Sequence, residues 1–422
     1  MKDMIYWIWL SLCCTPDTAT FPNLIERFGS AEEIYNADIK KISASLHPRS
    51  SDRTRLADKS LERANEVFEF CKKHNVGILT YADERYPESL RKISTPPVLL
   101  YYRGVLPDFS SGFYASVVGT RHLSDYGRRN AFKIAYDLAS AGATVVSGMA
   151  VGIDGVAHAG ALAADKPTVA VIGSGINVCY PNEHLKLARE IVKNGCILTE
   201  YAPGTKPGRY NFPCRNRIIS GLSSITVVIE GNERSGALIT ARHAANQGRT
   251  VYALPGNVGS KGSEATALLL KNGAKVCTSA DDIIRDFADE AGTRLNPFNL
   301  KSGIKLDVFS YLSKYGVSAL CPSDDVYYHG KSRSSVNVEK AEEKSATSQV
   351  VDTPKASVAP PESFDKRALS LYKKIPGSGD CSLDSLVSED FPITDVMKYL
   401  LKLEIGGFVT MLPGERVARK FK

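Results

Sequence analysis

The sequence lacks the paired cysteines that a structural zinc site or a thioredoxin-type redox site requires. Its 422 residues include nine cysteines, but no two of them form a Cys-x-x-Cys pair. An odd number of cysteines without regular spacing is typical of a reducing compartment. We therefore expect a cytoplasmic protein without a metal site.

A long apolar run is also missing. The most apolar segment, MIYWIWLSLCC at residues 4–14, is about half as long as the roughly 20 residues that a membrane-spanning helix needs. It is a poor secretory signal as well, because Asp3 follows Lys2 and no small-x-small cleavage site comes soon after it. We predict a buried first helix and no membrane partner.

Several motifs of nucleotide and acyl-transfer enzymes are absent. The chain has no G-x-x-x-x-G-K-[ST] phosphate loop and no G-x-S-x-G nucleophile elbow. The segment GSGINVCYP supplies Gly173 and Gly175, but Val178 stands where a dinucleotide fingerprint needs its third glycine. We therefore expect no nicotinamide or flavin cofactor.

Candidate catalytic pairs are few. Asp154 and His158 are four residues apart on one predicted helix face, but no convincing third ligand accompanies them. We expect a helix-start carboxylate and a partly buried histidine there. Glu200 and Glu230 end predicted strands, where they could act as bases or anchor neighbouring loops. This shortage of nucleophiles and acid–base pairs favours binding over catalysis.

Acidic residues are missing between Glu200 and Glu230, although the whole chain carries a net charge of only +7. Phe212 lies in this segment and could either stack on a base or pack beside Pro213. Basic side chains with an interleaved aromatic ring are typical of proteins that bind single strands without reading their sequence. The alternative for the basic residues is a solvated surface. They are Lys206, Arg209, Arg215 and Arg217.

The centre of the chain predicts an α/β fold. Short apolar, β-branched runs such as TVVSG, TVAVIG and ITVVIE alternate with helical patterns between about 115 and 287. This alternation is typical of a doubly wound, mostly parallel sheet of the Rossmann type, covered on both faces. Ligands of such sheets bind beyond the carboxyl ends of the strands.

The flanking segments predict three further parts. Residues 1–75 read as a small helical domain, and 76–295 as the extended Rossmann-like domain. Residues 296–364 form a partly disordered linker that is rich in Ser, Pro and Ala towards its end. Residues 365–422 read as three helices and a hairpin, the pattern of a winged helix, with SLDSLVSE as the second helix and Ser382 as its N-cap.

The predicted turns after the central strands form a phosphate-binding edge. Several helix N-termini follow these turns, and their N–H groups and dipoles favour an anion. Arg121 adds a permanent charge with a fork that suits phosphate oxygens. Hydroxyl donors come from Ser147, Ser174, Ser235 and Thr240.

The motifs in this region resemble the bacterial DNA-processing protein A family, also called Smf. They include VVGTR (117–121), VSGMAVGID (146–154), AVIGSGINVCYP (170–181), FPCRNRIISGLS (212–223) and SGALITARHAANQGRTVYALPG (235–256). The resemblance implies an extended Rossmann fold that binds single-stranded DNA and is not an enzyme. It also implies loading of the recombinase RecA onto incoming strands in natural transformation and homologous recombination. A homodimer is implied too, and single-strand-binding protein is a further possible partner.

The resemblance also implies site residues. Arg121 matches the arginine of the family's GSR-type motif, Phe212 its stacking aromatic, and Arg209 the basic residue three positions earlier. The glycine turns match its backbone-contacting turns. We expect the DNA-binding residues to be Gly119, Thr120, Arg121, Ser147, Gly148, Gly173, Ser174, Gly175, Lys206, Arg209, Phe212, Arg215, Asn216, Arg217, Ser235, Gly236 and Thr240.

Two other functions fit parts of the pattern. The same fold serves nucleotide-binding hydrolases that act on nucleoside monophosphates, although their PGGxGT-type turn is replaced here by ALPGNVGSKG at 253–262. A scaffold that binds only protein is the second alternative. Released base or phosphate would identify the first, and a lack of salt-sensitive DNA binding would identify the second.

Overall fold

The structure is a computed structural model of the chain. It describes residues 2–47, 50–287, 295–296, 299–300 and 306–317, residue 360, and parts of 365–419. Contacts divide the chain into two compact units, Met1–Gly330 and Lys331–Lys422. The predicted linker lies mostly outside the described residues.

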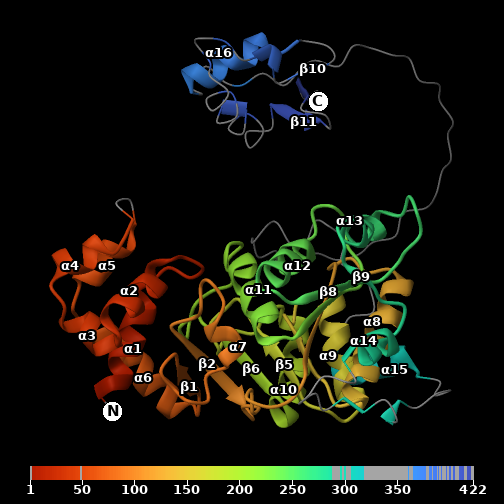
Figure 1. The fold of residues 1–422 in the computed structure, drawn as a ribbon, viewed down its shortest axis with the longest axis horizontal. Coiled ribbons are helices and arrows are strands. Elements are labelled where there is room, and N and C mark those ends of the chain that lie inside the picture. The colour runs from red at the N-terminus through yellow and green to blue at the C-terminus, as the bar shows by residue number, and fades with distance from the viewer. Residues whose placement is uncertain are drawn as a thin grey trace, which may run out of the picture. The chain divides into compact units, whose positions relative to one another are not determined.

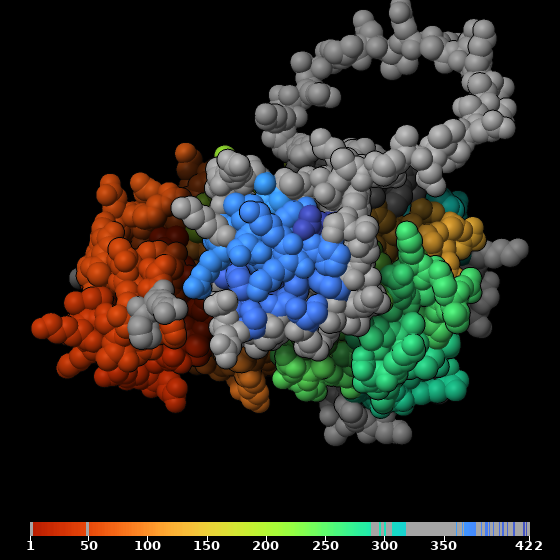
Figure 2. All heavy atoms as spheres, turned by 90° about the horizontal axis from the view of Figure 1, so that it is seen from above, coloured from red at the N-terminus to blue at the C-terminus, as the bar shows by residue number. Residues whose placement is uncertain are grey.

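The N-terminal segment is helical, as predicted. Its first helix is part of the core, with Trp7, Ile8 and Leu10 at most 2% exposed. Nowhere in the described residues is a helix both long and apolar enough to cross a bilayer. The helices of the N-terminal segment form a lobe at one end of the first unit (Figures 1 and 2). They are α1 (Lys2–Cys13), α2 (Thr20–Phe28), α3 (Ala31–Asn36), α4 (Ile39–Ala44), α5 (Asp52–Ala57) and α6 (Glu62–Lys73).

The first unit is built on a nine-stranded sheet with the order β1-β2-β6-β5-β4-β3-β7-β8-β9. Strands β3 to β9 pair in parallel, whereas β1 and β2 join the edge antiparallel. This confirms the predicted mostly parallel, Rossmann-like sheet. The strands are β1 (Gly77–Thr80), β2 (Leu99–Gly104), β3 (Tyr114–Val118), β4 (Thr144–Ser147), β5 (Thr168–Val171), β6 (Cys196–Thr199), β7 (Ile225–Val228), β8 (Thr250–Ala253) and β9 (Lys275–Val276).

The direction in which strands are added reverses at β3. From there β4, β5 and β6 extend the sheet to one side, and β7, β8 and β9 extend it to the other. The loops after β3 and β7 therefore separate towards opposite faces and leave a crevice between them. Ligands of open α/β sheets bind at such a switch point.

Helices cover both faces of the sheet (Figure 1). One face carries α8 (Asp125–Ser140), α9 (Ile153–Ala163), α10 (Leu185–Asn194), α14 (Ala280–Phe287) and α15 (Val308–Tyr315), and the other carries α7 (Glu88–Arg91), α11 (Asn211–Leu222), α12 (Gly236–Asn246) and α13 (Glu264–Lys271). Each face has its own cluster of buried apolar residues. The buried, β-branched strands lie between these two layers, which explains their continuous apolar runs.

The second unit contains helix α16 (Lys366–Lys374) and a three-stranded antiparallel sheet of order β10-β12-β11. The strands are β10 (Asp380–Ser382), β11 (Val409–Leu412) and β12 (Arg416–Arg419). The predicted hairpin is present, because β11 pairs with β12. Ser382, the predicted N-cap of the second helix, ends β10, and the described residues after it form a 3₁₀ turn at Asp384–Leu386. The winged helix as a whole stays a prediction.

Candidate nucleic-acid interface

A cavity of about 790 Å³ lies at the switch point, beside the carboxyl ends of β3 and β7. It brings together ten of the residues that the sequence predicted for DNA binding. These are Gly119, Thr120, Arg121, Arg209, Phe212, Arg215, Asn216, Ser235, Gly236 and Thr240. These residues come from separate segments of the chain, and the fold brings them together on one concave surface.

The loop after β3 places Arg121 at the cavity. The backbone N–H of Thr120 donates to the carbonyl of Glu230 at 2.7 Å, and the Thr120 carbonyl accepts from the Ile153 N–H at 3.2 Å. The loop is thus fixed to both neighbouring segments while the Arg121 side chain stays exposed. Its guanidinium lies 5.4 Å from the centre of the Phe212 ring, within cation–π range.

Phe212 lies in the first turn of α11 and lines the cavity half-buried. The preceding Asn211 donates to the carbonyl of Gly173 at 3.0 Å, which holds this turn against the loop after β5. A Cβ atom at Gly173 would lie 3.0 Å from the ring, so the missing side chain makes room for it. Tyr180 packs beside the ring at 5.6 Å between centroids. The cavity therefore has an aromatic wall.

Arg215 lies one turn further along α11 and is only 3% exposed. Its guanidinium donates to the carbonyl of Val171 at 2.6 Å, and Gly148 leaves space for it, because a Cβ there would overlap the guanidinium. Burial lowers the pKa of Arg215 to about 10, against the attraction of Asp154. Its charge thus sits in the floor of the cavity rather than on its rim.

The segment before α11 contributes two exposed cations. Arg209 lines the cavity, and its guanidinium packs on the Tyr210 ring at 4.7 Å and donates to the Tyr210 hydroxyl. Lys206 is exposed but does not line this cavity. It lies between Pro207, which lines the cavity, and Thr205, whose carbonyl accepts from the Gly175 N–H.

Arg217 is a correction to the sequence-based prediction. Its side chain is 2% exposed and forms a two-pronged ion pair with Glu200, each contact being 2.7 Å. Its Nε donates to the carbonyl of Thr95 at 2.8 Å. Burial alone would lower the pKa of Arg217, but Glu200 raises it above its ordinary value. The role of Arg217 is to anchor α11, because its donors are already used within the protein.

Helix α12 closes another side of the cavity. Ser235 is its N-cap and accepts from the Ala237 N–H at 3.3 Å. Gly236 stands in open space, since a Cβ atom there would meet no other atom within 4 Å, and its carbonyl accepts from Asn216 at 3.4 Å. Thr240 is buried at the base. The N–H groups of Ala237 and Leu238 are bonded to Ser235, so the helix start borders the cavity mainly through the Gly236 backbone and the helix dipole.

Three predicted contacts belong to the support of the site. The hydroxyl of Ser147 donates to the carbonyl of Val117, and that of Ser174 to the carbonyl of Val178. Both serines are buried, and the Gly175 N–H is bonded to Thr205. These groups are corrected from ligand donors to structural ones.

Two other predicted glycines border a small adjoining cavity. Gly148 and Gly173 line it together with Arg121 and Phe212. Their backbones therefore lie next to the first cavity without lining it. The lack of a side chain at each position leaves room for Arg215 and Phe212, respectively.

Sequence reasoning missed some lining residues. His122, Tyr180, Asn232 and Arg234 also line the cavity. The signal for Arg234 was present, since it lies in the GNERSG turn between β7 and α12. Tyr180 could have been found only through its contact with Phe212, which the chain order does not reveal.

The strand-end carboxylates are used within the protein: Glu230 anchors a loop, as one of the two alternatives had it, whereas Glu200 anchors helix α11. Glu230 is 7% exposed and accepts from the Ser124 N–H at 2.9 Å. Glu200 holds Arg217, as described above. Neither carboxylate lines the cavity at the switch point.

Asp154 is the expected carboxylate in the first turn of α9, but His158 is more deeply buried than expected. Asp154 lines the cavity beside Arg215 and is 8% exposed. Burial raises the pKa of Asp154, and Arg215 opposes this. His158 is fully buried against Thr168 at 2.8 Å. The described residues contain no cluster that could hold a metal ion.

The described lining of the cavity therefore combines four arginines, one buried carboxylate, aromatic rings and a helix N-terminus. Guanidinium groups and N–H donors bind phosphate oxygens, and the rings offer flat faces to bases. Such a surface suits a polyanion that also carries planar groups.

Comparison with known proteins gives a consistent result. A family model described as DNA recombination-mediator protein A matches residues 77–288. Protein Smf of Synechocystis sp. is 31% identical and covers 99% of both chains. The DNA processing protein DprA of Bacillus subtilis is 35% identical over 58% of this chain and 86% of its own. The X-ray structure of DprA from Streptococcus pneumoniae matches with a TM-score of 0.59 and 30% identity, covering 68% of this chain and 98% of that one.

Proposed function

Because the chain belongs to the DNA recombination-mediator protein A family, we propose that it binds single-stranded DNA without reading its sequence. The observation that carries this proposal is the grouping of Arg121, Arg209, Arg215 and Phe212 around one cavity at the switch point of the sheet. Guanidinium groups bind phosphates and an aromatic ring stacks on base faces, and these are parts that every nucleotide shares.

The exposed arginines contribute the electrostatic part of binding. Arg121 and Arg209 contact backbone phosphates, and each neutralised phosphate releases counterions, so affinity falls as salt rises. The buried Arg215 adds a fixed positive charge in the floor of the cavity. Phe212 stacks on a base, an interaction worth about 1–3 kcal/mol per base. The backbone N–H of Gly236, at the start of α12, adds a further donor.

We further propose that the protein delivers its strand to the recombinase RecA in the cytoplasm, during natural transformation or homologous recombination. This step, a homodimeric state and contact with single-strand-binding protein are expectations from the family. Assembly of RecA filaments on oligonucleotides coated with single-strand-binding protein, with and without this protein, tests the delivery step. Light scattering after size-exclusion chromatography tests the dimer.

The site is tested by replacing Arg121 and Arg209 together with alanine. We expect the variant to keep its fold and to bind labelled oligo-dT at least roughly tenfold more weakly, because two phosphates are no longer neutralised. The matched control replaces Lys40 and Lys41, two exposed cations of α4, with alanine. Binding of oligo-dT and of matched duplex is measured at two ionic strengths. Unchanged binding by the Arg121/Arg209 variant would refute the site.

One observation favours the alternative of a hydrolase acting on nucleoside monophosphates. Asp154 is a buried carboxyl with a raised pKa that lines the cavity, and such groups are frequent in active sites. Incubation of the pure protein with nucleoside monophosphates, followed by detection of free base or phosphate, tests it. Release that is abolished by Asp154→Asn would support the hydrolase.

A further inference from the structure

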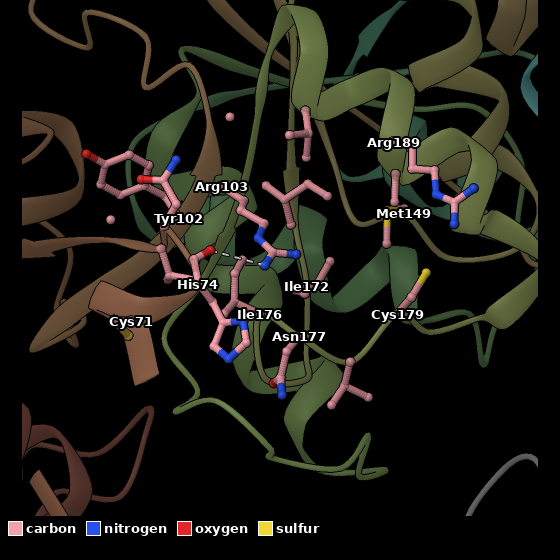
Figure 3. A pocket seen from close by; sticks show the side chains of 18 of the residues that line it. Cys71, His74, Tyr102, Arg103, Met149, Ile172, Ile176, Asn177, Cys179 and Arg189 are labelled. Atoms are coloured by element: carbon pink, nitrogen blue, oxygen red, sulfur yellow. Dashed lines mark hydrogen bonds between the residues drawn. The ribbon is translucent and has the colours of Figure 1, made fainter. Parts of the chain in front are cut away.

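A second and larger cavity, of about 1250 Å³, lies outside the site described above. Its lining comes mainly from β2, α10 and the end of α6, together with the loops after β4 and β5. Figure 3 shows His74 and Arg103 on one side of it, and Arg189, Met149 and Cys179 on the other.

The charged side chains that line this second cavity are basic. The described residues of its lining include Lys72, His74, Arg103, Arg189 and Lys193, and none of them is aspartate or glutamate. Lys193 is paired with Glu190 at 2.8 Å. The Arg103 guanidinium has one hydrogen bond, to the carbonyl of His74 at 3.3 Å (Figure 3). Within the part of the chain that the structure describes, no carboxylate forms an ion pair with Lys72, Arg103 or Arg189.

The floor of the second cavity is apolar. Met149, Ile172, Ile176 and Ile197 line it beneath the basic rim. Cations above an apolar floor suit a ligand that has anionic groups on a body with apolar faces. The cavity exceeds the roughly 300–1,000 Å³ of ordinary small-molecule sites, which favours a polymer segment over one small metabolite.

The two cavities are neighbours, because they share the walls between them. Cys179 lines the second cavity and the next residue, Tyr180, lines the first. Met149 likewise lines the second, while Ala150 lines the first. The exposed Asn177 stands on this shared loop, and its side chain accepts from the Gly204 N–H at 2.7 Å.

A basic residue also lies between the cavities. Lys206 belongs to the short segment whose Gly204 and Thr205 are bonded to Asn177 and Gly175, and the next residue, Pro207, already lines the first cavity. The exposed Lys206 therefore stands between Arg209 and the second cavity. Lys206 was predicted to bind DNA but does not line the first cavity, and this position would let it contact a strand that runs between the two cavities.

We propose that the second cavity holds the nucleotides that flank those in the first, so that one DNA strand continues over the loop at Asn177 towards the N-terminal helices. The inference rests on the proposed function and extends it to a second stretch of the same strand. Lys72, Arg103 and Arg189 contact its phosphates, and the apolar floor receives the bases.

The test compares oligo-dT of about 6 and about 20 nucleotides, lengths within and beyond the site sizes typical of single-strand binding folds. In the full-length protein, Arg103→Ala with Arg189→Ala should weaken binding of the longer strand by roughly fivefold or more and leave the shorter one unchanged. The slope of log affinity against log salt on the longer strand should fall by about 0.7 for each phosphate that is no longer neutralised. The control is Lys166→Ala with Lys271→Ala, which removes the same charge at exposed positions that line neither cavity.

If the double variant does not fold, Lys72→Ala with Arg189→Ala replaces it, since both side chains are exposed. A weakening confined to the longer strand supports the inference. Unchanged binding of both lengths, or equal weakening of both, overturns it while the first site stands. If the wild-type protein binds neither length, it is the proposed function that fails.

Discussion

At the scale of single residues, Arg217 shows how a basic side chain serves a binding site without touching the ligand. It joins Glu200 at the end of β6 to Thr95 in the loop before β2, and it lies in the same helix as Phe212 and Arg215. Removing one partner of a buried ion pair leaves an uncompensated charge, which costs about 3–5 kcal/mol. We expect Arg217→Met to lower the free energy of unfolding by that amount.

Urea denaturation measures this change. Arg217→Met with Glu200→Gln should recover part of the stability, because neither charge then remains unpaired. Arg209→Ala is the comparison, since this exposed residue should change stability by less than about 0.5 kcal/mol. An Arg217 variant as stable as the Arg209 variant would contradict the anchoring role.

His158 makes stability depend on pH. Burial, together with nearby His184 and Arg215, lowers the pKa of His158 from 6.5 to about 3. Between these values the unfolded chain binds a proton that the folded chain does not, so stability falls as pH drops below about 6.5. At pH 5 the decrease is roughly 2 kcal/mol.

His158→Asn removes this titration and keeps a donor for Thr168. We expect the difference in unfolding free energy between pH 7 and pH 5 to shrink by roughly 2 kcal/mol in the variant. His184, whose pKa burial also lowers, contributes in both proteins and cancels in the comparison. The same pH dependence in both proteins would show that His158 carries none of it.

Residue types could be predicted from the sequence, but their exposure could not. The acid-free segment indicated an anionic ligand, and Arg209 and Phe212 do lie at the cavity. Arg217 belongs to the same run, yet it faces Glu200. Arg215 and Arg217 are two residues apart on α11, so their side chains point in different directions. Only the packing of α11 against the sheet decides which of them meets Glu200.

At the scale of elements, the turn before α9 positions the loop after β3. Gly152 has φ +90°, and a Cβ there would lie 2.4 Å from the Thr120 carbonyl oxygen and 2.7 Å from the Arg121 Cα. Such a conformation costs a non-glycine residue about 1–3 kcal/mol, and the clash adds to it. We expect Gly152→Ala to lower stability by at least that amount and to weaken binding of oligo-dT by displacing Arg121.

Gly236→Ala is the matched control, because a Cβ at Gly236 meets no atom within 4 Å and its φ is not left-handed. Helix propensity alone should change stability by about 1 kcal/mol or less in that variant. Thermal denaturation of both proteins decides the comparison. Equal melting temperatures for the two variants would count against the proposed role of Gly152.

Elements were predictable where local pattern and burial agree. The central parallel strands are buried on both faces, so their apolar runs stand out from the polar turns. The predicted helix at 382–389 follows directly after β10, whose last residue, Ser382, lies opposite Arg416. That pairing joins segments far apart in the chain, which no local pattern reveals.

At the scale of the whole molecule, both cavities lie within Met1–Gly330. The switch point that creates the first cavity follows from strand order, and the second needs the N-terminal helices as one wall. The sequence indicated the first, because its motifs follow successive strands. It did not indicate the second, whose lining comes from α6, β2 and α10 and carries no shared motif.

Removal of residues 331–422 tests whether the first unit alone accounts for binding of single-stranded DNA. The second unit has its own buried cluster, and residues 365–422 hold ten Lys and Arg against eight Asp and Glu, a net charge of +2. Because this charge is small and the cavities are complete without it, the truncated chain should bind oligo-dT with an affinity within about twofold of the full chain and an equal salt slope. A flatter slope after truncation would mean that the second unit contacts phosphates of the same strand. An unchanged slope on oligo-dT with weaker binding of duplex alone would instead assign the second unit to double-stranded DNA, as a winged helix would predict.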